Sequence, residues 1–218
     1  MYRNTTFTQA MCGALLTVAI AAPRGAVAQR TIQPSLVAGA SSSTLQGTGD
    51  PIDRRTGFTI GAGLQVPLGT ALSFQTGLTY VQKGASSTDP ELGTAAIDLA
   101  YLQVPAMLRF AFGSGSVRPY VDGGLAFAYR LTCSARLSAD GVDVSAKCGD
   151  MGVDNGTGGS VDPIKKMDAS ALIGAGLDFG RFSVGARYDH GLTNIDNTGA
   201  DHVTNRSVMI LAGYRIGG

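Results

Sequence analysis

The chain has 218 residues, 17 basic and 16 acidic, and it contains 31 glycines but no tryptophan. The resulting net charge of +1 gives no electrostatic basis for binding nucleic acid, which requires a basic surface. Hydrophobic residues make up 44% of the chain, too many for a disordered protein, and the length fits one domain.

The first 28 residues have the layout of a secretory signal peptide. A short polar start is followed by an uncharged apolar stretch over 10–22 and by an A-x-A cleavage site, Ala26-Val27-Ala28. The apolar stretch is too short for a membrane-spanning helix, which needs about 20 residues. We therefore predict a cleaved signal peptide over 1–28 and a mature domain over 29–218. An uncleaved N-terminal anchor helix is the alternative.

The mature chain is predicted to form eight β-strands. Its apolar residues recur with period two, turn residues separate the runs, and no later segment has the period of a long amphipathic helix. Most runs reach the roughly 9–11 residues that a tilted membrane-crossing strand needs. The predicted strands are 34–41, 57–66, 71–82, 97–112, 117–132, 168–179, 182–192 and 205–216.

The two faces of these strands differ in character. In 71–82, Leu72, Phe74, Leu78 and Tyr80 share one face, and the opposite face is small or polar. The polar faces are rich in glycine, which suits the crowded inside of a narrow barrel. The apolar faces would then contact lipid.

The connections alternate between long and short. Outer-membrane barrels have short periplasmic turns and long external connections, so the two lengths alternate along the chain. Nothing in a Greek-key sandwich requires connection lengths to alternate in this way. We therefore predict an all-β, eight-stranded, antiparallel, up-and-down transmembrane barrel in the outer membrane of a Gram-negative bacterium, with both termini at the short-turn end. The short turns are 67–70, 113–116 and 180–181, and the long segments are 42–56, 83–96, 133–167 and 193–204.

Aromatic residues indicate the same arrangement. They form two groups near opposite ends of the predicted strands, as the two membrane interfaces favour. The short-turn group is Phe74, Phe110, Phe112, Phe179, Phe182 and Tyr214, and the long-segment group is Phe58, Tyr80, Phe127, Tyr129 and Tyr188.

Three segments resemble PorT-like and OmpA-like outer-membrane β-barrel domains. Residues 101–110 (YLQVPAMLRF) are similar to their fourth strand, 118–124 (RPYVDGG) to the opening of their fifth, and 185–195 (GARYDHGLTNI) to their seventh strand and the following loop. The resemblance spans 29–218 and implies an integral outer-membrane barrel. One departure is the C-terminus, which ends Ile216-Gly217-Gly218, where many such barrels end on an aromatic residue.

Charges of both signs fall on the predicted inward face. If the fourth and fifth strands pair about the 113–116 turn, Arg109 faces Tyr120 and lies one diagonal step from Asp122. Eight strands enclose room only for side chains, so we expect a packed ionic core, and a polar pore is the alternative. The predicted lumen residues are Arg109, Asp122, Arg130, Asp178, Arg187, Asp189 and Arg215.

Cys133 and Cys148 remain after signal-peptide cleavage. An exported chain meets an oxidising compartment, so a disulfide is expected, and two free thiols are the alternative. The bond would close a loop within the longest external segment, which we expect to contact an extracellular ligand. The other expected partners are outer-membrane lipid and, during biogenesis, the barrel-assembly machinery and periplasmic chaperones.

Two alternative functions remain open. His190 lies near the long-segment end of its strand, and Ser207 comes near it if the hairpin closes near 198. Lipid-modifying barrel enzymes use a His, a Ser and an acid near that rim, so a lipid A deacylase-like site is one alternative. Asp189 and His190 point to opposite faces of a strand, which breaks a direct relay, so we expect no enzyme.

The second alternative is a soluble periplasmic lipocalin-like carrier, with an apolar lumen and a polar outside. We also expect no cofactor and no metal. The Asp- and Gly-rich stretch 140–168 lacks the acid spacing and the closing Glu of an EF-hand calcium loop.

Overall fold

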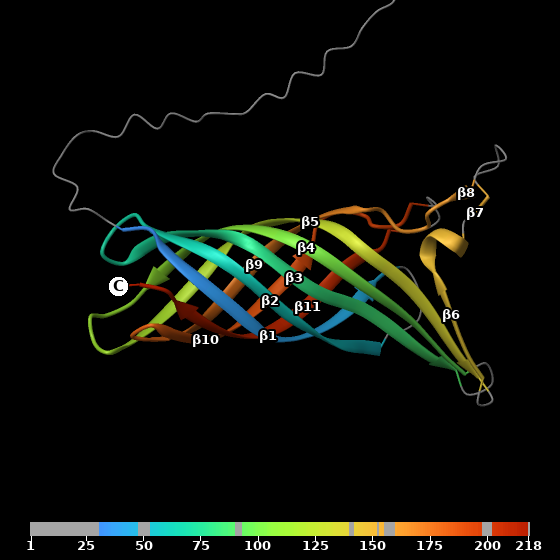
Figure 1. The fold of residues 1–218 in the computed structure, drawn as a ribbon, viewed down its shortest axis with the longest axis horizontal. Helices are drawn as coiled ribbons and strands as arrows, with labels where there is room; N and C mark the ends of the chain where they lie inside the picture. Colours follow the sequence, from blue (N-terminus) through green and yellow to red (C-terminus); the bar gives the residue numbers. More distant parts are fainter. Residues whose placement is uncertain are drawn as a thin grey trace, which may run out of the picture.

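The computed structural model describes residues 31–47, 53–89, 93–139, 142–151, 153–154, 160–197 and 202–217. The predicted signal peptide lies outside the described residues. Eight long strands wind around a common axis to form a barrel (Figure 1). They are β1 (Gln33–Gln46), β2 (Asp53–Pro67), β3 (Leu72–Asp89), β4 (Gly93–Ala111), β5 (Val117–Ala139), β9 (Met167–Phe179), β10 (Phe182–Gly191) and β11 (Thr204–Arg215).

The ring of eight strands is closed. The order is β4-β3-β2-β1-β11-β10-β9-β5, and an additional β4–β5 pairing joins its ends. Every neighbouring pair is antiparallel, and β1 pairs with β11 along most of its length. This confirms the predicted eight-stranded, up-and-down barrel.

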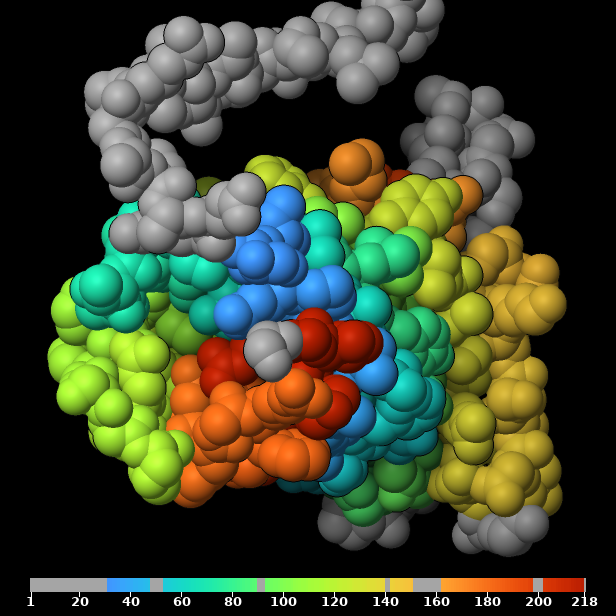
Figure 2. Space-filling view, turned by 60° about the vertical axis from the view of Figure 1, so that its left-hand side comes forward, coloured from blue at the N-terminus to red at the C-terminus, as the bar shows by residue number. Residues whose placement is uncertain are grey.

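The short turns, the start of β1 and the end of β11 lie at one end of the barrel, as predicted. Figure 2 brings this end forward and shows the first strand (blue) and the last strand (red) side by side. The opposite end carries four further elements, β6 (Val142–Lys147), η1 (Cys148–Met151), β7 (Val153–Asp154) and β8 (Ser160–Val161). Within the described residues, the structure has no helix of the length and apolarity needed to cross a membrane.

The prediction of long external loops at 42–56, 83–96 and 133–167 is wrong in part. The β3–β4 hairpin stays paired out to Asp89 and Gly93, and β5 continues to Ala139, where it pairs with β6. Antiparallel pairing satisfies the backbone donors and acceptors of these segments, so the sheet continues beyond the eight-stranded ring. We call this four-stranded projection of β3, β4, β5 and β6 the external sheet.

The two faces of the barrel wall divide as the sequence predicts. Large apolar side chains such as Ile60, Leu108, Leu125 and Ile173 stand on the outside, and polar or small residues line the inside. An apolar outside and a charged inside are the reverse of a soluble carrier, which excludes the lipocalin-like alternative. Aromatic rings contact one another within each predicted group: centroids lie 5.5 Å apart for Phe58–Tyr80, 4.9 Å for Phe110–Phe112 and 5.1 Å for Phe182–Tyr214.

Glycine on the inner face makes room for a large side chain in the lumen. A Cβ atom would lie 2.5 Å from the Tyr120 hydroxyl at Gly176 and 2.3 Å from it at Gly185. These two neighbouring strands can therefore approach the ring only because they carry no side chain there. The high glycine content thus reflects how tightly the lumen is filled.

The predicted register of the β4–β5 hairpin is wrong by two residues. Arg109 lies opposite Asp122, and Tyr120 lies opposite Ala111. The connection begins at Phe112, whose N–H donates to the carbonyl of Pro119 at 2.7 Å, and Gly113 adopts a positive φ of 73°. The hairpin is therefore centred one residue later than the predicted 113–116 turn.

Candidate functional site

Three arginines share two aspartates at the short-turn end of the lumen. Arg109 lies between Asp122 (Nη2–Oδ2 2.9 Å) and Asp178 (Nη1–Oδ1 3.3 Å). Arg187 is 3.3 Å from Asp122, and Arg215 is 3.5 Å from Asp178. Each carboxylate thus bridges two guanidinium groups, which offsets the cost of burying these charges. We call these five residues the arginine layer.

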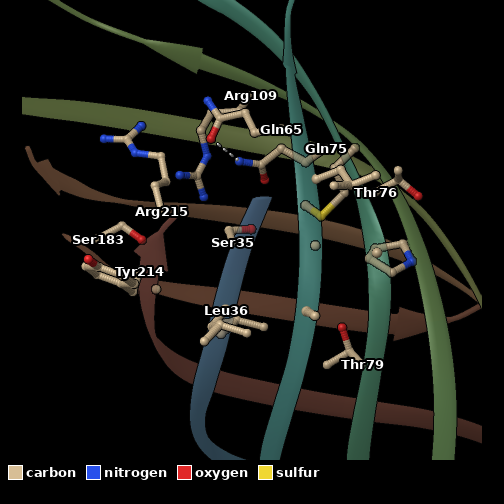
Figure 3. Close-up of a pocket in the computed structure, with 18 of the residues that line it drawn as sticks. Ser35, Leu36, Gln65, Gln75, Thr76, Thr79, Arg109, Ser183, Tyr214 and Arg215 are labelled. Atoms are coloured by element: carbon tan, nitrogen blue, oxygen red, sulfur yellow. Dashed lines mark hydrogen bonds between the residues drawn. The ribbon is translucent and has the colours of Figure 1, made fainter. Parts of the chain in front are cut away.

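The arginine layer borders a small cavity. Figure 3 shows Arg109 and Arg215 beside Gln65, Ser35 and Ser183 in this cavity, whose volume is about 90 Å³. The Arg109 guanidinium also lies 3.5 Å from the centroid of the Tyr120 ring, a cation–π distance. The cavity has room for a few water molecules.

A buried ion pair crosses the middle of the lumen. Lys83 Nζ lies 3.0 Å from Asp189 Oδ2, and Gln103 Nε2 donates to the same oxygen at 3.0 Å. The side chains of Lys83 and Asp189 are 1% and 0% exposed. Asp189 is a predicted lumen residue, whereas Lys83 and Gln103 are not among those predicted.

Lys83 was missed because the predicted strand ends at residue 82. The signal is nevertheless in the sequence. Ser73, Gln75, Thr79 and Val81 occupy alternate positions on the inner face, and the next position in that series is Lys83.

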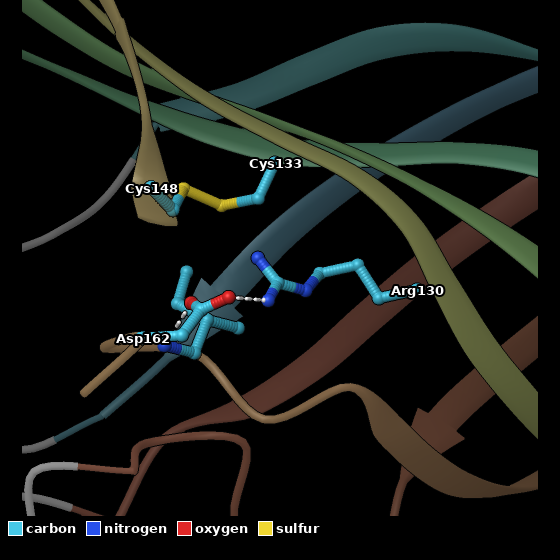
Figure 4. Close-up of a disulfide and its surroundings, with 5 residues drawn as sticks. Arg130, Cys133, Cys148 and Asp162 are labelled. Atoms are coloured by element: carbon cyan, nitrogen blue, oxygen red, sulfur yellow. Dashed lines mark hydrogen bonds and ion pairs between the residues drawn. A yellow bond between two sulfur atoms is a disulfide. The ribbon is translucent and has the colours of Figure 1, made fainter. Parts of the chain in front are cut away.

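A third polar group lies closer to the external end. Asn205 Nδ2 donates to Asp168 Oδ2 at 2.7 Å and to the Tyr101 hydroxyl at 3.3 Å. Arg130 forms an ion pair with Asp162, which lies on the connection before β9 and not on a barrel strand (Figure 4). All seven predicted lumen residues therefore take part in ion pairs, distributed over three levels of the barrel.

An apolar cluster lies at the external end of the lumen. Leu45, Leu99 and Tyr101 pack there with Ile195, and the partly buried Ile164 packs against them. Ile164 and Ile195 come from connections between strands, so these connections fold back over the barrel mouth. The buried Lys83–Asp189 pair lies next to this cluster, with Lys83 Nζ 5.5 Å from the centroid of the Tyr101 ring.

The disulfide joins Cys133 of β5 to Cys148 at the start of η1, with the two Cα atoms 5.4 Å apart. An irregularity positions Cys133: Tyr101 pairs with Arg130 and Ala100 with Thr132, which leaves Leu131 without a partner in β4. This bulge turns Cys133 toward the inner face, where it packs against the apolar cluster. The bond fixes the end of β6 to β5 (Figure 4).

Removing the disulfide is expected to loosen β6 without unfolding the barrel. In the Cys133→Ser/Cys148→Ser variant, proteinase should cut near β6 at least about tenfold faster, because a closed loop of this length is worth roughly 3 kcal/mol. The urea midpoint of the barrel should stay the same within error. A drop in that midpoint would show that the bond supports the barrel itself.

The inner face of the external sheet forms an apolar groove. It has a volume of about 500 Å³ and is lined from β1, β3, β4, β5 and β6. β6 is the last strand in the sheet order. It pairs with β5 along one edge, and its other edge pairs with no strand among the described residues. The apolar lining residues are Leu45, Ala85, Ala95, Ala96, Ile97, Ala135, Leu137, Val144 and Ala146.

The structure does not bring His190 and Ser207 together. Ser207 lies opposite Asp189 inside the barrel, so the hairpin does close near 198, but His190 lies opposite Arg206 on the outer face, beside Tyr188. The buried Ser207 hydroxyl has no hydrogen-bond partner within the described residues. A base that could activate it is therefore not in place.

Within the described ranges, no three His, Cys, Asp or Glu side chains are grouped as a metal site. Parts of the Asp- and Gly-rich stretch 140–168 fall outside those ranges.

A family model described as "Outer membrane protein beta-barrel domain" matches residues 23–197. Among solved structures, the attachment invasion locus protein Ail of Yersinia pestis is 20% identical, with 84% of this chain and 98% of that chain covered and a TM-score of 0.44. Neisserial surface protein A is 14% identical, with 84% and 96% covered and a TM-score of 0.48. The outer membrane enzyme PagL is 18% identical, with 83% and 99% covered and a TM-score of 0.42. No protein of curated function matches the chain.

Proposed function

Because the chain belongs to the outer membrane protein β-barrel domain family, we propose that it is an outer-membrane scaffold that presents its external sheet to an extracellular protein. The barrel anchors the sheet in the membrane. Its lumen is crossed by ion pairs at three levels, which supports an anchoring role over solute conduction.

The single observation that carries the proposal is the outer edge of β6 beside the apolar groove, which pairs with no other strand among the described residues. Val142 and Val144, on alternate positions of β6, are 62% and 57% exposed. Leu137 of β5, opposite Val144, is 49% exposed. A water-exposed strand edge with apolar residues on one face is a template for another strand.

The geometry specifies the kind of partner. An extended segment that pairs with β6 would satisfy its free backbone groups and place every second side chain over the groove. We therefore expect the partner to contribute a strand in which apolar and polar residues alternate. The disulfide at Cys148 stabilises the β6 edge before the partner arrives.

A designed peptide tests this proposal. The probe is a fluorescein-labelled octapeptide in which valine alternates with threonine and lysine, added to the full-length protein in lipid nanodiscs. Fluorescence anisotropy should show saturable binding. The Val142→Asp/Val144→Asp variant should bind at least about tenfold more weakly, since it loses two apolar contacts and gains two charges.

Two controls make the result specific. Ser145→Asp adds a charge on the opposite face of β6 and should change the affinity less than about twofold. A peptide of the same composition with its valines consecutive should bind weakly, because its apolar residues cannot all face the groove. Equal binding of both peptides, or no binding by either, would contradict the proposal.

We further propose that the protein has no catalytic role. Support comes from the placement of His190 outside and Ser207 inside the barrel wall. Mass spectrometry of lipid A from cells expressing the protein and its His190→Ala variant should give identical spectra. A lipid A species lost in the variant would establish the rim enzyme instead.

We also propose that the barrel-assembly machinery and periplasmic chaperones act on the chain during its insertion. The many apolar side chains on the outer face support this, because they would aggregate in water before insertion.

A further inference from the structure

A cationic pocket lies on the outer face of the sheet, just beyond the aromatic group at the external end. Arg55 donates to both carboxylate oxygens of Asp98, with an Nη2–Oδ2 distance of 2.8 Å. Arg136 Nε lies 3.4 Å from Asp98 Oδ2. Among the residues that the structure describes, Asp98 is the only carboxylate paired with either arginine. Two arginines and one aspartate give these three side chains a net charge of +1.

Backbone irregularity and a glycine place Arg55 on this face. The β2–β3 pairing shifts register between Arg54 and Thr59, and Arg55 lies within this irregular stretch. Its side chain then passes over Gly84, where a Cβ would lie 3.3 Å from Arg55 Cδ, to reach Asp98 on the far side of β3. Arg54 pairs with Ala85 of the inner face and so lies on the opposite side of the sheet.

Neighbouring aromatic residues indicate at which level of the membrane the pocket lies. The concavity has a volume of about 290 Å³, and its lining includes Tyr80, whose ring pairs with Phe58. Aromatic rings of this kind mark the membrane–water interface. The two arginines therefore lie at the level of the lipid headgroups, with apolar wall below them. Gln82 and Thr132 supply further polar groups to the lining.

We propose that this pocket binds the phosphate of a lipid headgroup in the outer leaflet. The planar guanidinium group presents paired N–H donors that match phosphate oxygens, and such charge-assisted bonds are the strong ones. Arg136 has a side chain that is 63% exposed and can turn toward an incoming anion. The acyl chains of the same lipid would lie along the apolar wall beside Phe58 and Tyr129, which are exposed on the outer face.

An ordinary surface ion pair explains the cluster less well than a phosphate site does. Such a pair needs one cation for one anion, and exposed pairs contribute little to stability, so the second arginine would add little. A phosphate between Arg55 and Arg136 balances the charge and explains why the surplus cation faces the headgroup layer rather than the external water.

Native mass spectrometry of the full-length protein in a non-ionic detergent tests the proposal. The probes are diphosphorylated lipid A and the same lipid after removal of its phosphates. We expect the phosphorylated lipid to bind at least about tenfold more tightly than the dephosphorylated lipid. Arg136→Gln should weaken binding of the phosphorylated lipid by about the same factor. Arg136→Lys keeps the charge but loses the paired donors, so its affinity should fall in between.

The matched control is Arg54→Gln, which removes an arginine from the adjacent position on the opposite face and should leave lipid binding unchanged. Arg136→Gln and Arg54→Gln should both keep the difference in gel mobility between unheated and heated samples that marks a folded barrel. Equal affinity for the two lipids, or no effect of Arg136→Gln, would overturn the proposal. Displacement of the lipid by about 10 mM inorganic phosphate would also overturn it, because the pocket would then be a site for soluble anions.

Discussion

Replacing Asp189 with alanine is expected to lower the free energy of unfolding by about 3–5 kcal/mol, because it leaves the buried Lys83 ammonium without its carboxylate. The side chain of Lys83 is 1% exposed, so water cannot replace the lost partner without opening the barrel. The amide of Gln103, which now donates to the same oxygen at 3.0 Å, would keep only its longer contact of 3.5 Å to the Ser170 hydroxyl. The measurement is a urea titration in lipid vesicles, with the folded fraction read from the mobility of unheated samples.

A double variant separates the loss of the pair from the loss of the charge. Lys83→Met/Asp189→Leu removes both ions and should recover most of the stability, since buried ion pairs are often replaceable by apolar side chains. Asp143→Ala is the matched control, because Asp143 is an exposed aspartate of the external sheet. It should change stability by less than about 0.5 kcal/mol. If Asp189→Ala behaves like Asp143→Ala, the ion pair does not stabilise the folded barrel.

The Lys83–Asp189 pair shows which parts of the lumen the sequence can predict and which it cannot. Period-two alternation and sorted connection lengths were enough to predict the barrel, its strand number and the end at which the termini lie. Asp189 was predicted to point inward because it lies within a clearly alternating strand. Lys83 was not, because the predicted strand ends at residue 82, whereas β3 continues to Asp89.

Other features of the site depend on tertiary structure and have no local signal. The partner of Arg130 is Asp162, which comes from a connection that folds back over the lumen. The bulge at Leu131 reverses which residues of β5 face inward, so Leu137 joins the groove instead of the outer face. Arg55, in the irregular stretch of β2, likewise reaches across β3 to Asp98 on the outer face. Alternation alone could not have predicted any of these three positions.

A single arginine in the lipid-facing wall should also be strongly destabilising. Ile210 lies on the outer face of β11, opposite Ala40 and Ala186 and between the levels of Tyr188 and Tyr214. It therefore lies near the middle of the membrane, where an arginine on the lipid face of a barrel costs about 2–4 kcal/mol. We expect Ile210→Arg to lower the unfolding free energy by this amount in the same urea titration.

The matched control for Ile210→Arg is Val142→Arg on β6. Both positions carry β-branched residues and are similarly exposed, 56% for Ile210 and 62% for Val142, but only Ile210 faces lipid. Val142→Arg should therefore change stability by less than about 0.5 kcal/mol, because its charge stays in water. Because the two positions are similarly exposed, a difference in their loss of unfolding free energy reports whether lipid or water surrounds the residue, not how deeply it is buried in the protein. Equal effects would mean that the apolar wall is not surrounded by hydrocarbon, and the position of the headgroup pocket above it would then lose its physical basis.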